Sequence, residues 1–127
     1  MPNGYQGSPK EWVRISSPLE KIDYILEEFA NKNKLPLSVN TNNSPNRELK
    51  WTFQIERIIQ IYLEDENELT WSLRICANQF RNSINMSKNK IILKGVSIEV
   101  LQNELSSALE EAYDTVINWN SDVLGIS

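Results

Sequence analysis

Hydrophobic and polar residues alternate along most of the stretch from residue 49 to residue 77. The apolar residues of this stretch fall mainly at odd-numbered positions, whereas the even-numbered positions are mostly polar. The apolar set comprises Leu49, Trp51, Phe53, Ile55, Ile59, Ile61, Leu63, Leu69, Trp71, Leu73, Ile75 and Ala77. A period of two is typical of strands that bury one face. The pattern therefore predicts a hairpin whose odd-numbered face packs on the core and whose even-numbered face contacts water.

Parity also constrains the connection inside this hairpin. The apolar residues of both strands share one side only if the loop has an odd length, such as 66–68 or 64–68. The first apolar run, 49–63, is long for a strand, and we expect strong twist or a bend near 56–58. A one-residue bulge at that point would switch the parity of the apolar residues, which does not happen in the sequence.

Two other segments carry apolar residues at helical spacing. The first follows Ser17, a preferred N-cap residue, and predicts a helix over 18–32. The second follows Ser97 and predicts a long helix over 98–119 with one apolar stripe. The stripe comprises Leu101, Leu105, Ala108, Leu109, Ala112, Val116 and Trp119.

The remaining segments complete the expected fold. Residues 35–39 predict a short strand, which Pro36 confines to a sheet edge or to the start of pairing. Residues 78–89 fit either a ragged strand or a loop, and 90–94 predict a last strand. A helix, several strands with short connections and a long helix is an α+β order. We expect a two-layer α+β domain: an antiparallel meander sheet of four or five strands with the N-terminal helix and the long C-terminal helix packed on one face.

Length and composition favour one globular domain. The chain has 127 residues, of which 40% are hydrophobic, so we expect a single domain over 1–127 with flexible ends at 1–11 and 120–127. No apolar run approaches the roughly 18 residues that span a bilayer, and we expect no signal peptide in residues 1–10. The single cysteine, Cys76, cannot form an internal disulfide, which favours a cytoplasmic location.

Charge and residue types argue against several functions. The net charge of −4 opposes binding to nucleic acid and to anionic membranes. The chain has no histidine, the commonest general base and transition-metal ligand. Glu64, Asp65, Glu66 and Glu68 surround one turn, but the alternating aspartates and the glycine of a calcium loop are missing. We therefore expect no catalytic residue, no cofactor and no metal site.

Arg57 is the one charged residue that interrupts the apolar row. The expected register places it near Ile75 or Ala77, where a buried guanidinium would need a carboxylate, carbonyl groups or an anionic ligand. Two interpretations remain open. Either the strand bends and Arg57 reaches solvent at the sheet edge, or Arg57 and Gln79 bind an anionic small molecule.

The even-numbered face carries a second candidate. Ile58, Tyr62 and Cys76 share this face and form a small apolar patch, which is typical of a surface that binds another protein or a second copy of the chain. Alternatively, residues 34–48 or the N-terminal segment cover the patch. Cys76 has no histidine to activate it, so we do not expect it to act as a nucleophile.

Two segments carry a resemblance to known families, WTFQIERIIQIYLEDENELTWSLRI and KNKIILKGVSIEVLQNELSSALEEAYDTVINW. With these, the chain resembles small uncharacterised cyanobacterial proteins that have a helix, an antiparallel meander and a second helix. It is also partly similar to YbjN-like and type III secretion chaperone-like domains, which have an extra middle helix that residues 78–89 do not supply. The first resemblance implies a fold, and the second implies a chaperone function.

These observations lead to two main functional hypotheses, beside a third, an enzyme that uses carboxylates and lysine alone. The first is a non-enzymatic cytoplasmic protein that binds another protein, as an accessory or assembly factor, through the second face of the sheet or an edge strand. Its partner is a different protein or, in a homodimer, a second copy of this chain. The alternative is a domain that binds an anionic small molecule between helix and sheet around Arg57.

Overall fold

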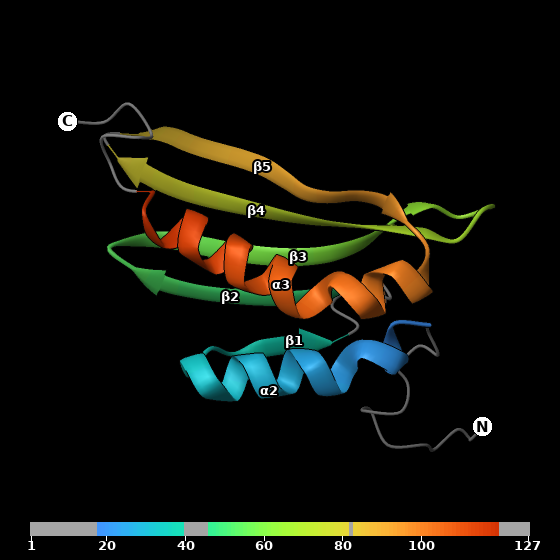
Figure 1. Ribbon diagram of the computed structural model, residues 1–127. Helices are drawn as coiled ribbons and strands as arrows, with labels where there is room; N and C mark the ends of the chain where they lie inside the picture. The colour runs from blue at the N-terminus through green and yellow to red at the C-terminus, as the bar shows by residue number, and fades with distance from the viewer. Residues whose placement is uncertain (1–17, 40–45, 82, 120–127) are drawn as a thin grey trace, which may run out of the picture.

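The protein is described by a computed structural model covering residues 18–39, 46–81 and 83–119. The elements in chain order are η1 (Pro18–Ile22), α2 (Asp23–Asn33), β1 (Leu37–Val39), β2 (Arg47–Phe53), β3 (Ile55–Asp65), β4 (Thr70–Arg81), β5 (Ile84–Val96) and α3 (Ile98–Ile117) (Figure 1). The expected α+β fold is confirmed. The ends expected to be flexible, 1–11 and 120–127, lie outside the described residues, as does Ser17.

The five strands form one antiparallel meander. Their order in the sheet is the order of the chain, from β1 at one edge to β5 at the other (Figure 1). Short connections favour this arrangement because consecutive strands then pair with each other. The prediction that 35–39 would provide an edge strand is confirmed by β1.

The stretch expected to form one strand over 49–63 forms parts of two strands instead. The chain reverses at Gln54, whose φ is +67°, and Trp51 of β2 lies opposite Arg57 of β3. Because odd-numbered residues face odd-numbered residues across this turn, the apolar alternation continues through it unchanged. The bend predicted near 56–58 is therefore wrong, and the parity argument could not detect the reversal.

The β3–β4 hairpin has the expected register but not the expected loop. Arg57 lies opposite Ala77, one of the two neighbours that the sequence predicted, and the apolar residues of both strands share one face. The residues between the two strands, 66–69, are four in number, so the prediction of an odd loop length is wrong. A register shift between Leu63 and Asp65 restores the pairing of odd with odd residues.

Residues 78–89 extend the β4–β5 hairpin, with a turn between the two strands. The two strands pair in unbroken register from Arg74 opposite Ile91 to Arg81 opposite Ile84, and the register shifts between Arg74 and Leu73 and again between Leu73 and Trp71. The strand interpretation of this segment is therefore correct.

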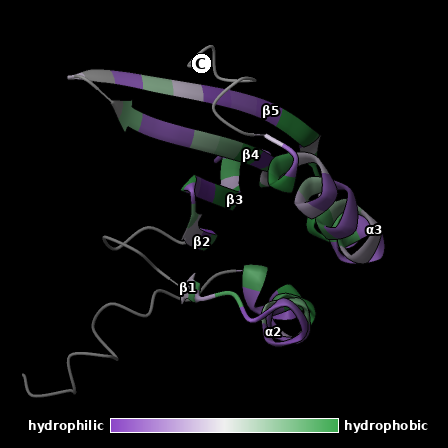
Figure 2. Ribbon diagram, turned by 90° about the vertical axis from the view of Figure 1, so that its left-hand side faces the viewer, coloured by the Kyte–Doolittle hydropathy of each residue, from purple (hydrophilic) through white to green (hydrophobic). Residues whose placement is uncertain are grey.

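Both helices lie on one face of the sheet (Figure 2), the face that carries the buried odd-numbered residues of β2, β3 and β4. The α3 helix packs on β3, β4 and β5, while α2 lies beside β1. Ser97 caps α3 as predicted, because its Oγ accepts a hydrogen bond from the Val100 backbone N–H at 3.2 Å. The apolar residues enclosed between the layers are Leu19, Ile22, Ile25, Leu26, Phe29, Ala30, Leu49, Ile55, Ile59, Ile61, Trp71, Leu73, Ile75, Ala77, Leu101, Leu105, Ala108, Leu109, Ala112, Val116 and Trp119.

Candidate functional site

Arg57 lies on the buried face of β3, with 1% of its surface exposed. Its guanidinium group lies between the β2–β3 turn and the C-terminal end of α3. Five backbone carbonyl groups accept its hydrogen bonds: Val116 (from Nε, 3.0 Å), Trp119 (from Nη2, 2.7 Å), Ile117 (from Nη2, 3.5 Å), Ile55 (from Nη1, 3.4 Å) and Phe53 (from Nη1). A guanidinium has five N–H donors, so the number of acceptors matches the number of donors.

The positive charge of Arg57 lies at the end of α3, where helix carbonyl groups carry a partial negative charge. The Phe53 ring adds a cation–π contact, with its centroid 5.6 Å from the guanidinium carbon. Burial lowers the pKa of Arg57, and the electrostatic interaction with Tyr113 acts in the opposite direction. The group remains protonated at neutral pH, because the ordinary pKa of arginine lies far above neutrality. Arg57 thus joins the turn to the helix end.

This geometry can be compared with the two interpretations of Arg57. The interpretation that Arg57 reaches solvent at a sheet edge is wrong, because β3 is the central strand and the side chain is buried. An anionic ligand would need guanidinium donors that face it, but these donors face carbonyl groups. Gln79 is half-buried opposite Met86 and accepts none of these hydrogen bonds. The geometry therefore gives no support to a ligand site at Arg57 and Gln79.

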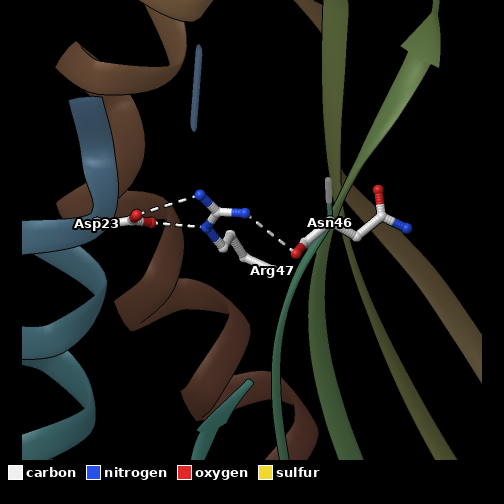
Figure 3. A network of polar contacts seen from close by, with 3 residues as sticks. All are labelled: Asp23, Asn46 and Arg47. Atoms are coloured by element: carbon white, nitrogen blue, oxygen red, sulfur yellow. Dashed lines mark hydrogen bonds and ion pairs between the residues drawn. The ribbon is translucent and has the colours of Figure 1, made fainter. Parts of the chain in front are cut away.

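A second buried arginine, Arg47, was not predicted from the sequence. It is also 1% exposed. Its Nε and Nη2 donate to the two carboxylate oxygens of Asp23 at 2.7 and 3.1 Å, and its Nη1 donates to the Asn46 carbonyl at 3.3 Å (Figure 3). This two-pronged contact joins the first residue of β2 to the first residue of α2. Position 47 is odd-numbered, and odd-numbered residues of the following strand face the core. This continuation of the alternation could have predicted that Arg47 is buried.

The face of the sheet opposite the helices, which carries the even-numbered residues of β3 and β4, is here called the outer face. The apolar patch expected there is divided by the polar pair Gln60 and Arg74. Ile58 and Cys76 lie directly opposite each other, but Gln60 and Arg74 separate them from Tyr62. Arg74 Nε donates to Gln60 Oε1 at 2.8 Å, and its guanidinium lies 5.2 Å from the centre of the Tyr62 ring. All three apolar residues are half-buried. The outer face is therefore not a continuous apolar surface.

Other polar side chains of the outer face also contact one another. Glu56 accepts a hydrogen bond from Asn78 at 2.9 Å and lies 3.4 Å from Lys50 Nζ. Burial raises the pKa of the Cys76 thiol, although Arg74 and the hydrogen bond to Asn78 oppose this effect. The thiol is thus mainly protonated at neutral pH, which disfavours a nucleophilic role.

The acidic turn has no arrangement suited to a cation. Asp65 Oδ1 accepts hydrogen bonds from the backbone N–H groups of Asn67 and Glu68 at 2.8 and 3.2 Å. The Glu64 carboxylate instead accepts one from the Ser72 hydroxyl at 2.6 Å. Within residues 18–39, 46–81 and 83–119, no group of three or more acidic or cysteine side chains could hold a metal ion.

Ser72, a buried hydroxyl that the sequence analysis did not identify, links three strands. It accepts a hydrogen bond from the Gly95 backbone N–H at 2.9 Å and donates to Glu64. Lys94 Nζ lies 3.8 Å from the same carboxylate. The Ser72 hydrogen bond is the main cause that lowers the pKa of Glu64, with a smaller contribution from Lys94, while desolvation acts against them.

The helix layer contains a hollow of about 310 Å³ between α2 and α3. It is lined by Ile25, Glu28, Phe29, Lys32, Ser106, Leu109 and Glu110. Lys32 Nζ lies 3.7 Å from Glu110 Oε2 across the seam, and both side chains are mostly exposed. These two charges pair with each other and need no ligand. The hollow is therefore explained as the space along the line where two packed helices meet.

The free edge of β5 is the most exposed feature of the sheet. At 13 residues β5 is the longest strand, whereas β1 at the opposite edge has three residues. Among the described residues, β5 pairs only with β4, and the five consecutive residues at positions 87–91 are all exposed. Over residues 84–91, β5 therefore presents a regular row of backbone N–H and C=O groups that pair with no other strand in the described part of the chain.

In the described part of the chain, no helix is both long and apolar enough to cross a membrane. Comparison of the chain with protein-family models, with curated proteins and with solved structures gave no match. The choice among the candidate surfaces therefore depends on their geometry.

Proposed function

We propose that this protein is a non-enzymatic protein-binding accessory or assembly factor, and that a strand of its partner pairs with the edge of β5. The supporting observation is the 13-residue edge strand β5, in which the five consecutive residues at positions 87–91 are all exposed. Strands usually have about five or six residues, and edge strands are usually short or covered. The unpaired backbone groups of an exposed edge favour the addition of a further strand, which is a common mode of peptide recognition.

The edge is a better candidate than the outer face of the sheet. On the outer face, the polar side chains bond one another around Glu56 and Arg74, and the apolar residues are divided into separate spots. Along β5, in contrast, backbone groups on one side of the strand have no partner strand among the described residues. The single cysteine, Cys76, is consistent with a reducing compartment, so the proposal assigns the protein to the cytoplasm.

A site-specific cross-linking experiment tests this function. A photoreactive amino acid would replace Asn89, which is exposed on β5, and in a control protein would replace Ser107, which is exposed on α3. After irradiation in a lysate of the source cells, we expect one stoichiometric protein partner to be linked at position 89 and none at position 107. Equal labelling at both positions, or none at either, would contradict the proposal.

Hydrogen exchange then tests the mode of binding. The partner identified by cross-linking would be purified and mixed with the unmodified protein. We expect slower exchange of the alternate backbone amides within residues 84–91 that point away from β4, because the added strand would accept their hydrogen bonds. Protection confined to α2 and α3 would show that the partner binds the helix layer and would overturn the assignment to β5.

A further inference from the structure

The exposed edge strand has a charge opposite to that of the whole chain. The chain contains 17 acidic and 13 basic residues. β5 nevertheless contains three lysines and no acidic residue in the sequence INMSKNKIILKGV. The edge available to a partner is thus locally basic in an acidic protein.

Two of these lysines lie side by side on the same face of the strand. Lys88 lies opposite Ala77 and Lys90 opposite Ile75, so both are on the side that the helices cover, yet both are exposed. Lys88 Nζ lies 5.4 Å from the centre of the Trp119 ring. In the part of the chain that the structure describes, neither lysine forms an ion pair, whereas Lys94 lies near Glu64.

We infer that the partner segment is an extended acidic strand with carboxylates at alternate positions, which pair with Lys88 and Lys90. This inference rests on the proposed function, because it specifies the chemistry of the strand that β5 binds. Side chains directly opposite each other on neighbouring strands lie close enough to interact, and pairs of opposite charge stabilise the pairing. The residues between the carboxylates would face Asn89 and Ile91 on the other side of the sheet.

A second copy of the chain fits this edge less well. If two β5 strands paired antiparallel with their helices on one side, every register centred between residues 88 and 90 would place Lys88 or Lys90 opposite a lysine of the other copy. Like charges at opposed positions destabilise strand pairing. The same lysines therefore oppose pairing between two copies and favour an acidic partner.

Two synthetic peptides provide the test, SETEVETS and its basic counterpart SKTKVKTS, each acetylated and amidated. Binding would be followed at low ionic strength by the backbone amide NMR signals of residues 84–91 and by the indole N–H signal of Trp119. We expect SETEVETS to shift these signals and to bind about tenfold more tightly than SKTKVKTS. The difference should decrease as salt is added, because both contacts are exposed.

Charge-reversed variants distinguish specific pairing of the peptide with Lys88 and Lys90 from nonspecific attraction between oppositely charged molecules. The double variant Lys88→Glu/Lys90→Glu should bind SKTKVKTS more tightly than SETEVETS. Lys90→Glu alone leaves the contact between Lys88 and Trp119 intact and should reduce the preference. The matched control, Lys21→Glu/Lys34→Glu, changes the net charge equally at two exposed positions outside the sheet and should keep the original order.

Several outcomes would overturn the inference. They are equal affinity for both peptides, an unchanged order in Lys88→Glu/Lys90→Glu, no shift with either peptide, and a dimer in sedimentation without peptide. If Lys88 and Lys90 only prevent edge-to-edge aggregation of β5, the acidic and the basic peptide should bind with equal affinity. The cross-linking and exchange experiment does not depend on charge, so protection of β5 by a partner without alternating carboxylates would refute this inference and leave the proposed function standing.

Discussion

The two buried arginines satisfy the same requirement in different ways. Arg47 faces the carboxylate of Asp23 at 2.7 and 3.1 Å, whereas the hydrogen bonds of Arg57 go to backbone carbonyl groups. Each has 1% of its surface exposed, and each joins the sheet to the helix layer. One contact supplies a full opposite charge, and the other supplies several partial charges in fixed positions.

This difference predicts which property of each arginine matters. Removal of the Asp23 carboxylate takes the opposite charge away from Arg47, and a buried charge without its counter-charge is strongly destabilising. Removal of the Arg57 side chain takes the donor away from several buried carbonyl groups at once. Stability should therefore depend mainly on charge at Arg47 and mainly on donor geometry at Arg57.

The largest effect is expected for Arg57→Met, which keeps much of the side-chain volume and removes all the donors. The free energy of unfolding should fall by about 3 to 4 kcal/mol, because buried carbonyl groups at the turn and the helix end lose their partners. Urea unfolding followed by circular dichroism measures this change. A loss below about 1 kcal/mol would mean that water replaces the donors and that this end of the core is open.

A slightly smaller effect is expected for Asp23→Asn. This change keeps the shape of the side chain but removes the charge that faces Arg47, and should lower the free energy of unfolding by about 2 to 3 kcal/mol. The matched control is Asp114→Asn on the exposed face of α3, which should change it by less than about 0.5 kcal/mol. Similar values for the two variants would show that the charge of Asp23 is unimportant.

Lysine substitutions compare the two sites directly. Lysine keeps the charge but lacks the planar fork of donors, so Arg57→Lys should cost about 2 kcal/mol and Arg47→Lys about 1 kcal/mol. Both variants can be measured in the same urea series. Equal losses, or a larger loss at Arg47, would contradict the distinction between charge and donor geometry.

A gain of stability is expected at the turn that Arg57 contacts. Gln54 has a φ of +67°, a conformation that glycine adopts without steric cost, so Gln54→Gly should raise the free energy of unfolding by about 0.5 to 1 kcal/mol. The neighbouring substitution Thr52→Gly, within β2, should lower it by a similar amount. A loss in Gln54→Gly would indicate that its side chain stabilises the turn.

The smallest effect is expected at Glu64, where the carboxylate is exposed rather than buried. Its pKa is lowered in the folded protein, mainly by the Ser72 hydroxyl. Its stabilising contribution is therefore complete above the pKa of the unfolded chain and is lost as the pH falls through the folded pKa. Thermal unfolding of the wild type and of Glu64→Gln from pH 7 to pH 3 should show a difference that shrinks on acidification. A difference independent of pH would contradict this linkage.

The burial of Arg57 was within reach of sequence reasoning, but its partners were not. The alternation of the sequence predicted that it lies near Ile75 or Ala77, of which Ala77 is its neighbour, and that a buried guanidinium needs acceptors. The acceptors could not be identified, because they lie at the end of α3, 59 to 62 residues further along the chain. No local pattern specifies where a helix end docks.

Two other features could not be predicted from the sequence, for a shared physical reason: the reversal at Gln54 was missed, and residues 78–89 were left open between a strand and a loop. The reversal at Gln54 preserves parity, so a period-two pattern is identical for one long strand and for two paired strands. The N-terminal half of β5 lies at an edge where residues on both faces are exposed, so no alternation of hydrophobicity marks it. Hydrophobic periodicity reports burial of one face, and it cannot report a reversal or an edge that buries neither face.

The distance along the chain between Arg57 and its acceptors has a consequence during synthesis. The ribosome adds about 5 to 20 residues per second, so roughly 3 to 12 seconds separate translation of Arg57 from translation of the last turn of α3. During that interval the meander hairpins can close, because such local pairing takes microseconds. Until α3 is made, the guanidinium lacks its acceptors at the helix end and has to be hydrated at this end of the apolar face, where its charge opposes premature contact with other nascent chains.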